Sequence, residues 1–187
     1  AETLEHEVIG VDLFAAFIEL CRERAREAAV GNRCSFRCAD ILKLAGEIEP
    51  VDVAIFAALG DVLGPLDETI GVIRQLVKPG GYMIISDDYL EEEAPTSLPS
   101  YDEYVSHEET LRRLQLHGDV VEREIIEEDD EEDDEGALIR CRAAVLAEKH
   151  PEPAEAFGRF ADDQDRAYAY IAEHLVAAIW VLRRAAN

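Results

Sequence analysis

Two aspartates stand at the ends of short apolar runs, where carboxylates could bind a ligand. Asp12 ends the run EVIGVD, and Asp40 ends CSFRCAD. An acid at the carboxyl end of a strand in a parallel sheet lies over the crevice where ligands bind, and its two oxygens can accept both hydroxyls of a ribose. A single such acid is more often the N-cap of the next helix. Two of them on successive strands favour a nucleoside site.

Other residues near predicted strand ends could act as acids or bases, namely Asp61, Asp88, Tyr89 and His107. Each of them also has a purely structural interpretation. Asp61 can cap the helix that follows it, Asp88 and Tyr89 can shape a loop, and His107 fits the first turn of a capped helix. The sequence therefore leaves the catalytic residue open.

Apolar spacing predicts short strands that alternate with amphipathic helices in the first half of the chain. The strands are expected at 7–12, 34–40, 51–59 and 82–89. Gly64-Pro65 begins the helix before the last of these strands, and a Lys-Pro-Gly-Gly turn at 78–81 ends it. This order, with short links, is typical of a parallel α/β sheet.

The second half of the chain begins with a capping pattern and ends with an apolar run. Residues 106–109 have the S-x-x-E form that precedes a helix, and a strand is expected at 119–126. Residues 136–174 are expected to be helical with a break at 150–153. A last, buried strand is expected at 176–184.

The chain is strongly acidic, with 42 acidic residues against 18 basic ones and a net charge of −24. An uninterrupted run of acids from 127 to 135 is typical of a solvated loop, and it lacks the spaced glycine of a calcium site. A field of this sign repels phosphate backbones, which argues against nucleic acid as a partner. No metal site is expected.

The sequence also bears on the compartment. Its longest apolar runs, such as that at 176–182, are well short of the roughly 20 residues that cross a bilayer, and the first residues do not resemble a secretory signal. The four cysteines lack the spacing of metal ligands and are expected to be reduced core residues. We therefore expect a cytoplasmic protein without a membrane partner.

The segment QLVKPGGYMIISDD, at 75–88, adds a more specific signal. Preceded in order by VIGVDLFAAFIELCRERA, RCADIL and VDVAIFAALGDVLG, it resembles the class I S-adenosylmethionine-dependent methyltransferase family of the small-molecule type. The resemblance covers about residues 4–127 and is consistent with a closing strand at 176–183. It implies a Rossmann-like α/β fold with a mostly parallel sheet, helices on both faces, an antiparallel C-terminal strand and a helical insertion.

The resemblance further implies a cofactor, S-adenosylmethionine, and the residues that bind it. Asp12, with Leu13 beside it, matches the acid that binds the ribose hydroxyls. Ala39-Asp40-Ile41 matches the segment beside the adenine, and Ala57-Ala58 the wall near the methionine part. The implied reaction is methyl transfer to a small-molecule acceptor.

Members of that family begin with a strand and a glycine-rich loop, and no such segment precedes residue 7 here. The resemblance implies that this strand lies between those at 7–12 and 51–57. Without it, two rows of backbone groups in the core would be unpaired. We therefore expect a preceding segment that carries the strand, with a strand supplied by another chain as the alternative.

Three segments are expected: a cofactor-binding core at 1–127, an acidic loop and helical insertion or lid at 128–174, and a closing strand at 175–187. Two other functions remain open. An acid after the second strand also serves NAD, so an NAD-dependent oxidoreductase is one of them. A non-catalytic nucleoside-binding module is the other, and whether this chain is active by itself is left undecided.

Overall fold

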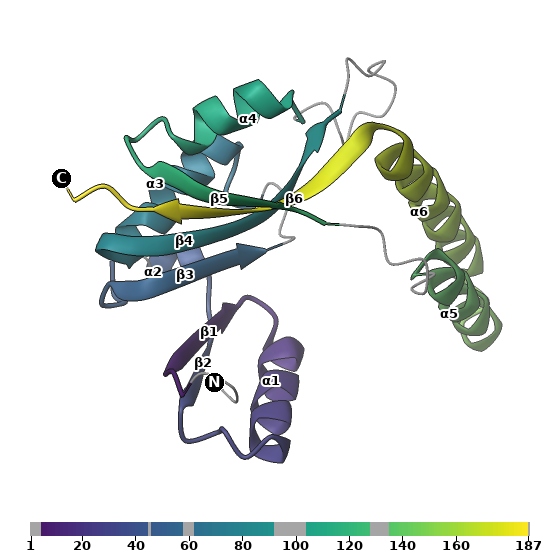
Figure 1. The fold of residues 1–187 in the computed structure, drawn as a ribbon. Helices are drawn as coiled ribbons and strands as arrows, with labels where there is room; N and C mark the ends of the chain where they lie inside the picture. The colour runs from purple at the N-terminus through teal and green to yellow at the C-terminus, as the bar shows by residue number, and fades with distance from the viewer. Residues whose placement is uncertain (1–4, 45, 58–61, 92–103, 128–134, 187) are drawn as a thin grey trace.

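The computed structural model describes residues 5–44, 46–57, 62–91, 104–127 and 135–186, and its elements alternate largely as the sequence predicts (Figure 1). The strands are β1 (Val8–Asp12), β2 (Cys34–Cys38), β3 (Val51–Ala57), β4 (Val77–Leu90), β5 (Val120–Ile126) and β6 (Leu175–Arg183). The helices are α1 (Ala15–Glu27), α2 (Ile41–Leu44), α3 (Leu66–Leu76), α4 (His107–Leu114), α5 (Glu135–Lys149) and α6 (Ala154–His174).

The strands form two hydrogen-bonded sheets. Strands β1 and β2 are parallel to each other, and the larger sheet has the order β3-β4-β6-β5. In the larger sheet β3 and β4 are parallel, whereas β6 is antiparallel to both of its neighbours, as predicted for the closing strand. No ladder joins β1 to β3 in the described part of the chain, so the strand expected between them stays a prediction.

One face of the four-stranded sheet forms the core, and helices α3 and α4 cover it (Figure 1). Successive residues of a strand point to opposite faces, so the buried Met83 and Ile85 of β4 lie on the covered face. On β3 the alternate residues Val53 and Ile55 are 46% and 70% exposed. The described residues therefore leave part of the other face apolar and open to solvent.

The Lys-Pro-Gly-Gly segment lies inside strand β4, which begins at Val77 directly after α3. Val51 is opposite Val77 and Val53 is opposite Tyr82, so the segment forms a large bulge. A Cβ on Gly81 would lie 2.7 Å from the carbonyl oxygen of Asp52, which explains why only glycine fits there. The prediction that the strand begins after a separate turn is wrong, because the turn residues bulge out of a continuous strand.

Helix α4 is fixed beside the end of β4. The Ser106 hydroxyl accepts a hydrogen bond from the Glu109 backbone N–H at 3.4 Å, which confirms the predicted cap. The Leu90 backbone N–H donates to the Val105 carbonyl at 2.9 Å, and Leu90 bridges Ser106. These contacts place His107, the first residue of α4, next to the carboxyl end of β4.

Helices α5 and α6 pack against each other at one end of the larger sheet, and α6 leads directly into β6 (Figure 1). The break between them at 150–153 is as predicted. The acidic loop lies mostly at 128–134, outside the described residues. None of the helices in the described ranges is long and apolar enough to cross a membrane.

The four cysteines are free, and Cys21, Cys38 and Cys141 are exposed. The prediction that they belong to the core is wrong. Strand β2 pairs only with β1 among the described residues, so it lies outside the core of the larger sheet.

The difference between the two faces gives a stability prediction. Ile85 is 1% exposed on the covered face, whereas Ile55 is 70% exposed on the neighbouring strand. We expect Ile85→Ala to lower the free energy of unfolding by about 2–4 kcal/mol, because it leaves a cavity in the core. Ile55→Ala is the matched control and should lower it by less than about 1 kcal/mol. Urea denaturation measures both, and equal losses would contradict the assignment of the core face.

Candidate functional site

The carboxyl ends of β1 and β2 bring the two predicted ligand acids together. Asp12 is the last residue of β1 and lies opposite Cys38 of β2. The backbone N–H of Ala39 donates to the Asp12 carbonyl at 2.9 Å, and Asp40 follows directly. The ribose and adenine residues predicted from the sequence therefore lie side by side at one edge of this sheet.

Asp12 has one carboxylate oxygen engaged and one available. Its Oδ1 accepts from the Phe14 backbone N–H at 2.7 Å, which closes the turn before α1. The N-cap of α1 is Phe14, which makes no side-chain capping bond, so Asp12 does not cap the helix directly. In the described part of the chain the other oxygen, Oδ2, has no hydrogen-bond partner, while Leu13 next to it is 65% exposed. An apolar side chain beside a free carboxylate oxygen suits a sugar hydroxyl.

Asp40 is more occupied than Asp12. Its Oδ1 accepts from the Leu42 backbone N–H at 3.0 Å, and Lys43 Nζ lies 3.4 Å from Oδ2. Ile41, which begins α2, packs against the core of the larger sheet. The Asp40 side chain thus stabilises the start of α2, which is the capping role expected as the alternative to ligand binding. The backbone of Asp40 remains beside Asp12.

The remaining predicted cofactor residues lie at the end of β3. Ala57 is its last residue, is exposed, and pairs with Ser86 of β4. Ala58 and the candidate base Asp61 lie outside the described residues. Of the two alanines predicted to lie near the methionine part of the cofactor, the structure therefore places only Ala57, next to β4.

Strand β4 ends in two half-buried acids. Asp87 Oδ1 accepts from the Asp88 backbone N–H at 2.9 Å. Burial raises the pKa of Asp87 to about 6, and burial followed by the nearby charge of Glu127 raises the pKa of Asp88. Ser86 Oγ donates to Glu127 at 3.4 Å, so a third acid lies at the same strand end.

Tyr89 and His107, the other two predicted candidates, are in contact. Their ring centroids are 4.8 Å apart, and His107 Nε2 lies 2.8 Å from Glu124 Oε1 on β5. Burial, and then the charges of Glu124 and Glu91, raise the pKa of Tyr89, so its phenol stays protonated at neutral pH. A histidine held by a carboxylate is an arrangement that can accept a proton.

Sequence reasoning missed Glu124 and Asp87. In β5 the register shifts between Val121 and Arg123, and this bulge turns Glu124 to the side of Trp180. The alternation of polar and apolar residues gives no sign of such a shift. Asp87 follows the same strand as the predicted Asp88, but its burial depends on packing by distant segments.

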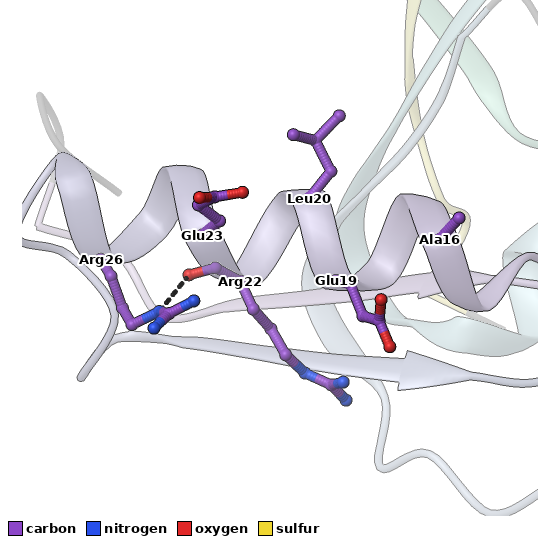
Figure 2. A pocket seen from close by; sticks show the side chains of 6 residues that line it. All are labelled: Ala16, Glu19, Leu20, Arg22, Glu23 and Arg26. Atoms are coloured by element: carbon purple, nitrogen blue, oxygen red, sulfur yellow. Dashed lines mark hydrogen bonds between the residues drawn. The ribbon is translucent and has the colours of Figure 1, made fainter.

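A shallow hollow on α1 is a second place to consider, and Figure 2 shows it. Its lining residues all come from this helix: Ala16, Glu19, Leu20, Arg22, Glu23 and Arg26. Arg26 Nε donates to the Arg22 carbonyl at 3.3 Å, and Arg22 Nη2 donates to the Phe36 carbonyl at 2.9 Å. Mixed charges on one helix offer no pairing of a base with a nucleophile. Nor do the described residues hold any group of three histidine, cysteine or acidic side chains that could bind a metal ion.

Comparison with protein families identifies the class. A family model described as a methyltransferase domain matches residues 1–154, which is most of the chain. The chain therefore belongs to this methyltransferase family, and the predicted resemblance and enzyme class are confirmed. A comparison with curated proteins found no match.

Several solved structures share this fold, and two of those compared here are S-adenosylmethionine-dependent methyltransferases. One from Geobacter sulfurreducens, in complex with S-adenosylhomocysteine, is 22% identical with a TM-score of 0.78, over 93% of this chain and 74% of that one. One from Thiobacillus denitrificans, with the same ligand, is 22% identical with a TM-score of 0.77, over 97% and 77%. YjhP from E. coli is 20% identical with a TM-score of 0.79, over 94% and 76%. The predicted Rossmann-like fold class is thus confirmed.

The buried carboxyl of Asp87 gives a pH-dependent stability prediction. Because the pKa is raised in the folded protein, its contribution to stability is present below about pH 4 and is lost as the pH rises through about 6. Near pH 8 we expect Asp87→Asn to raise the free energy of unfolding by roughly 1 kcal/mol, after a discount for the solvent-facing part of the group.

Near pH 4 this gain should vanish, because the Asp87 carboxyl is then protonated in the folded protein and carries no charge, like the asparagine that replaces it. Asp162→Asn, an exposed acid on α6, is the control and should change stability by less than about 0.5 kcal/mol at either pH. Denaturation curves at the two pH values measure the effect. A gain from Asp87→Asn that is the same at both would contradict a buried, ionising carboxyl.

Proposed function

We propose that this protein transfers a methyl group from S-adenosylmethionine to a small-molecule acceptor, and that Asp12 holds the ribose of the cofactor. The observation that carries the proposal is the free carboxylate oxygen of Asp12 at the joined ends of β1 and β2. Membership of the methyltransferase family supports it. So do the Geobacter and Thiobacillus structures, whose ligand is S-adenosylhomocysteine.

The residues present fit such a cofactor. Asp12 can accept ribose hydroxyls with Oδ2 while Oδ1 keeps its bond to Phe14, and the exposed Leu13 can pack against the sugar. The small Ala39 and the backbone of Asp40-Ile41 would lie beside the adenine. Ala57, with Ala58 after it, would border the methionine part. None of the positions matched to the cofactor holds a cationic side chain that would repel a sulfonium.

In this reaction the bound sulfonium supplies an activated methyl group whose leaving group needs no acid. The protein's residues therefore work mainly by aligning two reactants and by excluding water. A base is needed only where the acceptor must lose a proton before it attacks. Among the described candidates for that role, Tyr89 and His107 lie together, whereas Asp88 points to the opposite face of β4.

The charge of the protein restricts the acceptor and the partners. A net charge of −24 and the acids at the end of β4 favour a neutral or cationic small molecule over one that carries phosphate, and they disfavour nucleic acid. The four free cysteines suit a reducing cytoplasm.

We also propose that 1–127 and 175–187 form one cofactor-binding unit, with 128–174 as an insertion. The pairing of β6 with both β4 and β5 supports this division, because it places the last segment inside the sheet of the first. Helices α5 and α6 pack against each other as an insertion would.

Calorimetric titration tests the cofactor assignment. We expect the protein to bind S-adenosylmethionine and S-adenosylhomocysteine, and Asp12→Ala to weaken both by roughly 10- to 100-fold, as expected for a lost charge-assisted hydrogen bond. Asp52→Ala is the control, because Asp52 is an exposed acid paired with Lys78 and should leave the affinity unchanged.

Two results would contradict the proposal. Tight binding of NAD, with no binding of S-adenosylhomocysteine, would favour an oxidoreductase. Unchanged affinity in Asp12→Ala would remove Asp12 from the ribose site.

A further inference from the structure

Side chains from three strands share one face at the carboxyl end of β4. In the ladder between β4 and β6, Ile85 is opposite Trp180 and Asp87 is opposite Ala178. In the ladder between β5 and β6, Glu124 is also opposite Trp180. Residues directly opposite each other on neighbouring strands lie on the same face. Asp87, Trp180 and Glu124 therefore face the side that α4 covers, with Tyr89 two residues beyond Asp87.

The aromatic rings of this face lean over Asp87. Tyr89 is four residues from Ile85, the partner of Trp180, so the two positions are about 13 Å apart along the strands. Their ring centroids are nevertheless only 6.1 Å apart, which means that the side chains lean toward each other across the pair of Asp87 and Ala178. His107 also contacts the Tyr89 ring, with 4.8 Å between the two ring centroids.

Trp180 carries an unsatisfied polar group into this cluster. The residue is fully buried, and its Nε1–H has no hydrogen-bond partner within the described ranges. A buried donor without an acceptor costs about 1–3 kcal/mol, so such groups need an explanation. Because the Trp180 ring leans toward Tyr89, an oxygen or other acceptor of a molecule bound at this strand end is one partner that could satisfy it after a small local movement.

Asp87 has no cationic partner in the described part of the chain, where no lysine or arginine forms an ion pair with it. The ranges outside the description contain no lysine, arginine or histidine at all. Asp88, the next residue, points to the opposite face of the sheet. A half-buried carboxylate without a counter-charge is unfavourable when ionised, and a bound cation relieves that cost.

His107 supplies a base beside Tyr89, on the same face of the sheet as Asp87. When Nε2 donates its proton to Glu124 at 2.8 Å, the other ring nitrogen, Nδ1, carries the lone pair. Nδ1 has no hydrogen-bond partner among the described residues. Glu124 then stabilises the imidazolium that forms when Nδ1 takes a proton, as a carboxylate does for a catalytic histidine.

We propose that the methyl acceptor is a small amine that binds as its ammonium ion against Asp87, and that His107, oriented by Glu124, removes the proton before transfer. This inference rests on the proposed function and names the substrate class of the same site. Tyr89, protonated and aromatic, lines the site and attracts the cation through its ring face.

The step balances in atoms and charge. The ammonium nitrogen gives one proton to His107 Nδ1 and becomes a neutral amine with a lone pair. That lone pair forms the new bond to the methyl carbon while the carbon–sulfur bond breaks, and its electrons remain on sulfur. The product is the N-methyl ammonium ion with S-adenosylhomocysteine, and His107 later releases its proton to water.

A panel of amines tests the substrate class, with alcohols and phenols of the same carbon skeletons as the comparison. Products are identified by mass spectrometry after incubation with S-adenosylmethionine, and amine binding to the S-adenosylhomocysteine complex is measured by calorimetry. We expect methylation of amines and not of their hydroxyl analogues. Asp87→Asn should raise KM for the amine and weaken its binding by at least about tenfold, with the affinity for S-adenosylhomocysteine unchanged.

The role of His107 is tested by the pH profile. The titratable groups around it are Glu124 on β5, Tyr89 and Asp87 on β4, and Glu91 after β4. His107→Gln should lower kcat by roughly 100-fold or more near neutral pH. It should recover activity as the pH rises toward the pKa of the amine itself, because free amine then needs no base. Glu122→Gln, a change on the same strand as Glu124, is the control and should leave kcat unchanged.

Several outcomes would overturn the inference. One is a protein that binds S-adenosylhomocysteine but methylates no amine in the panel. Another is that Asp87→Asn weakens the binding of S-adenosylhomocysteine instead of the binding of the amine, which would assign Asp87 to the ammonium group of the cofactor. A third is an equal loss of activity in His107→Gln at every pH, which would mean a structural role. Failure to bind S-adenosylhomocysteine at all would instead contradict the proposed function.

Discussion

The arrangement of the side chains at the end of β4 depends on the pairing of β6 between β4 and β5. Nine positions of β4, from Tyr82 to Leu90, pair with β6, which lies far away in the sequence. This ladder buries Trp180 under α4 and sets Asp87 and Tyr89 on the same face as Glu124. Because backbone hydrogen bonds fix the register, a shift of β6 by one residue against β4 would turn Trp180 to the face opposite Asp87 and Tyr89. The chemistry proposed at the end of β4 therefore depends on a contact made by the last strand.

The carboxylates of Asp12 and Asp87 differ in their surroundings. Asp12 accepts a hydrogen bond from a backbone N–H with one carboxylate oxygen and keeps the other oxygen for a neutral hydroxyl. Asp87 is half-buried among aromatic rings and other acids, and burial raises its pKa to about 6. A carboxylate with a free oxygen suits a hydroxyl ligand, whereas a half-buried carboxylate gains most from a bound cation. This contrast is the physical reason for assigning the cofactor to one end and a cationic acceptor to the other.

Much of the fold and part of the site could be predicted from the sequence, because they depend on local patterns. Asp12, Asp40 and the cap at Ser106 follow from residue type next to a strand or helix end, and the structure has them there. Features set by bulges could not be predicted. If β5 alternated regularly from Val121, Arg123 would lie opposite Trp180, but the extra residue in the bulge puts Glu124 there instead. The early start of β4 at Val77 has the same cause.

Burial was the other limit, since it depends on which segments pack together. The sequence shows neither that Asp87 of β4 is half-buried nor that Cys21, Cys38 and Cys141 are exposed. Only the packing of α4, β5 and β6 distinguishes them.

The proposed role of Asp12 is to bind the ribose of the cofactor. A crystal structure of the protein with S-adenosylhomocysteine tests this role most directly. We expect both ribose hydroxyls to lie within hydrogen-bonding distance of the Asp12 carboxylate, with the hydrogen bond from the Phe14 N–H to Oδ1 retained. A ligand whose ribose lies away from the joined ends of β1 and β2 would contradict it.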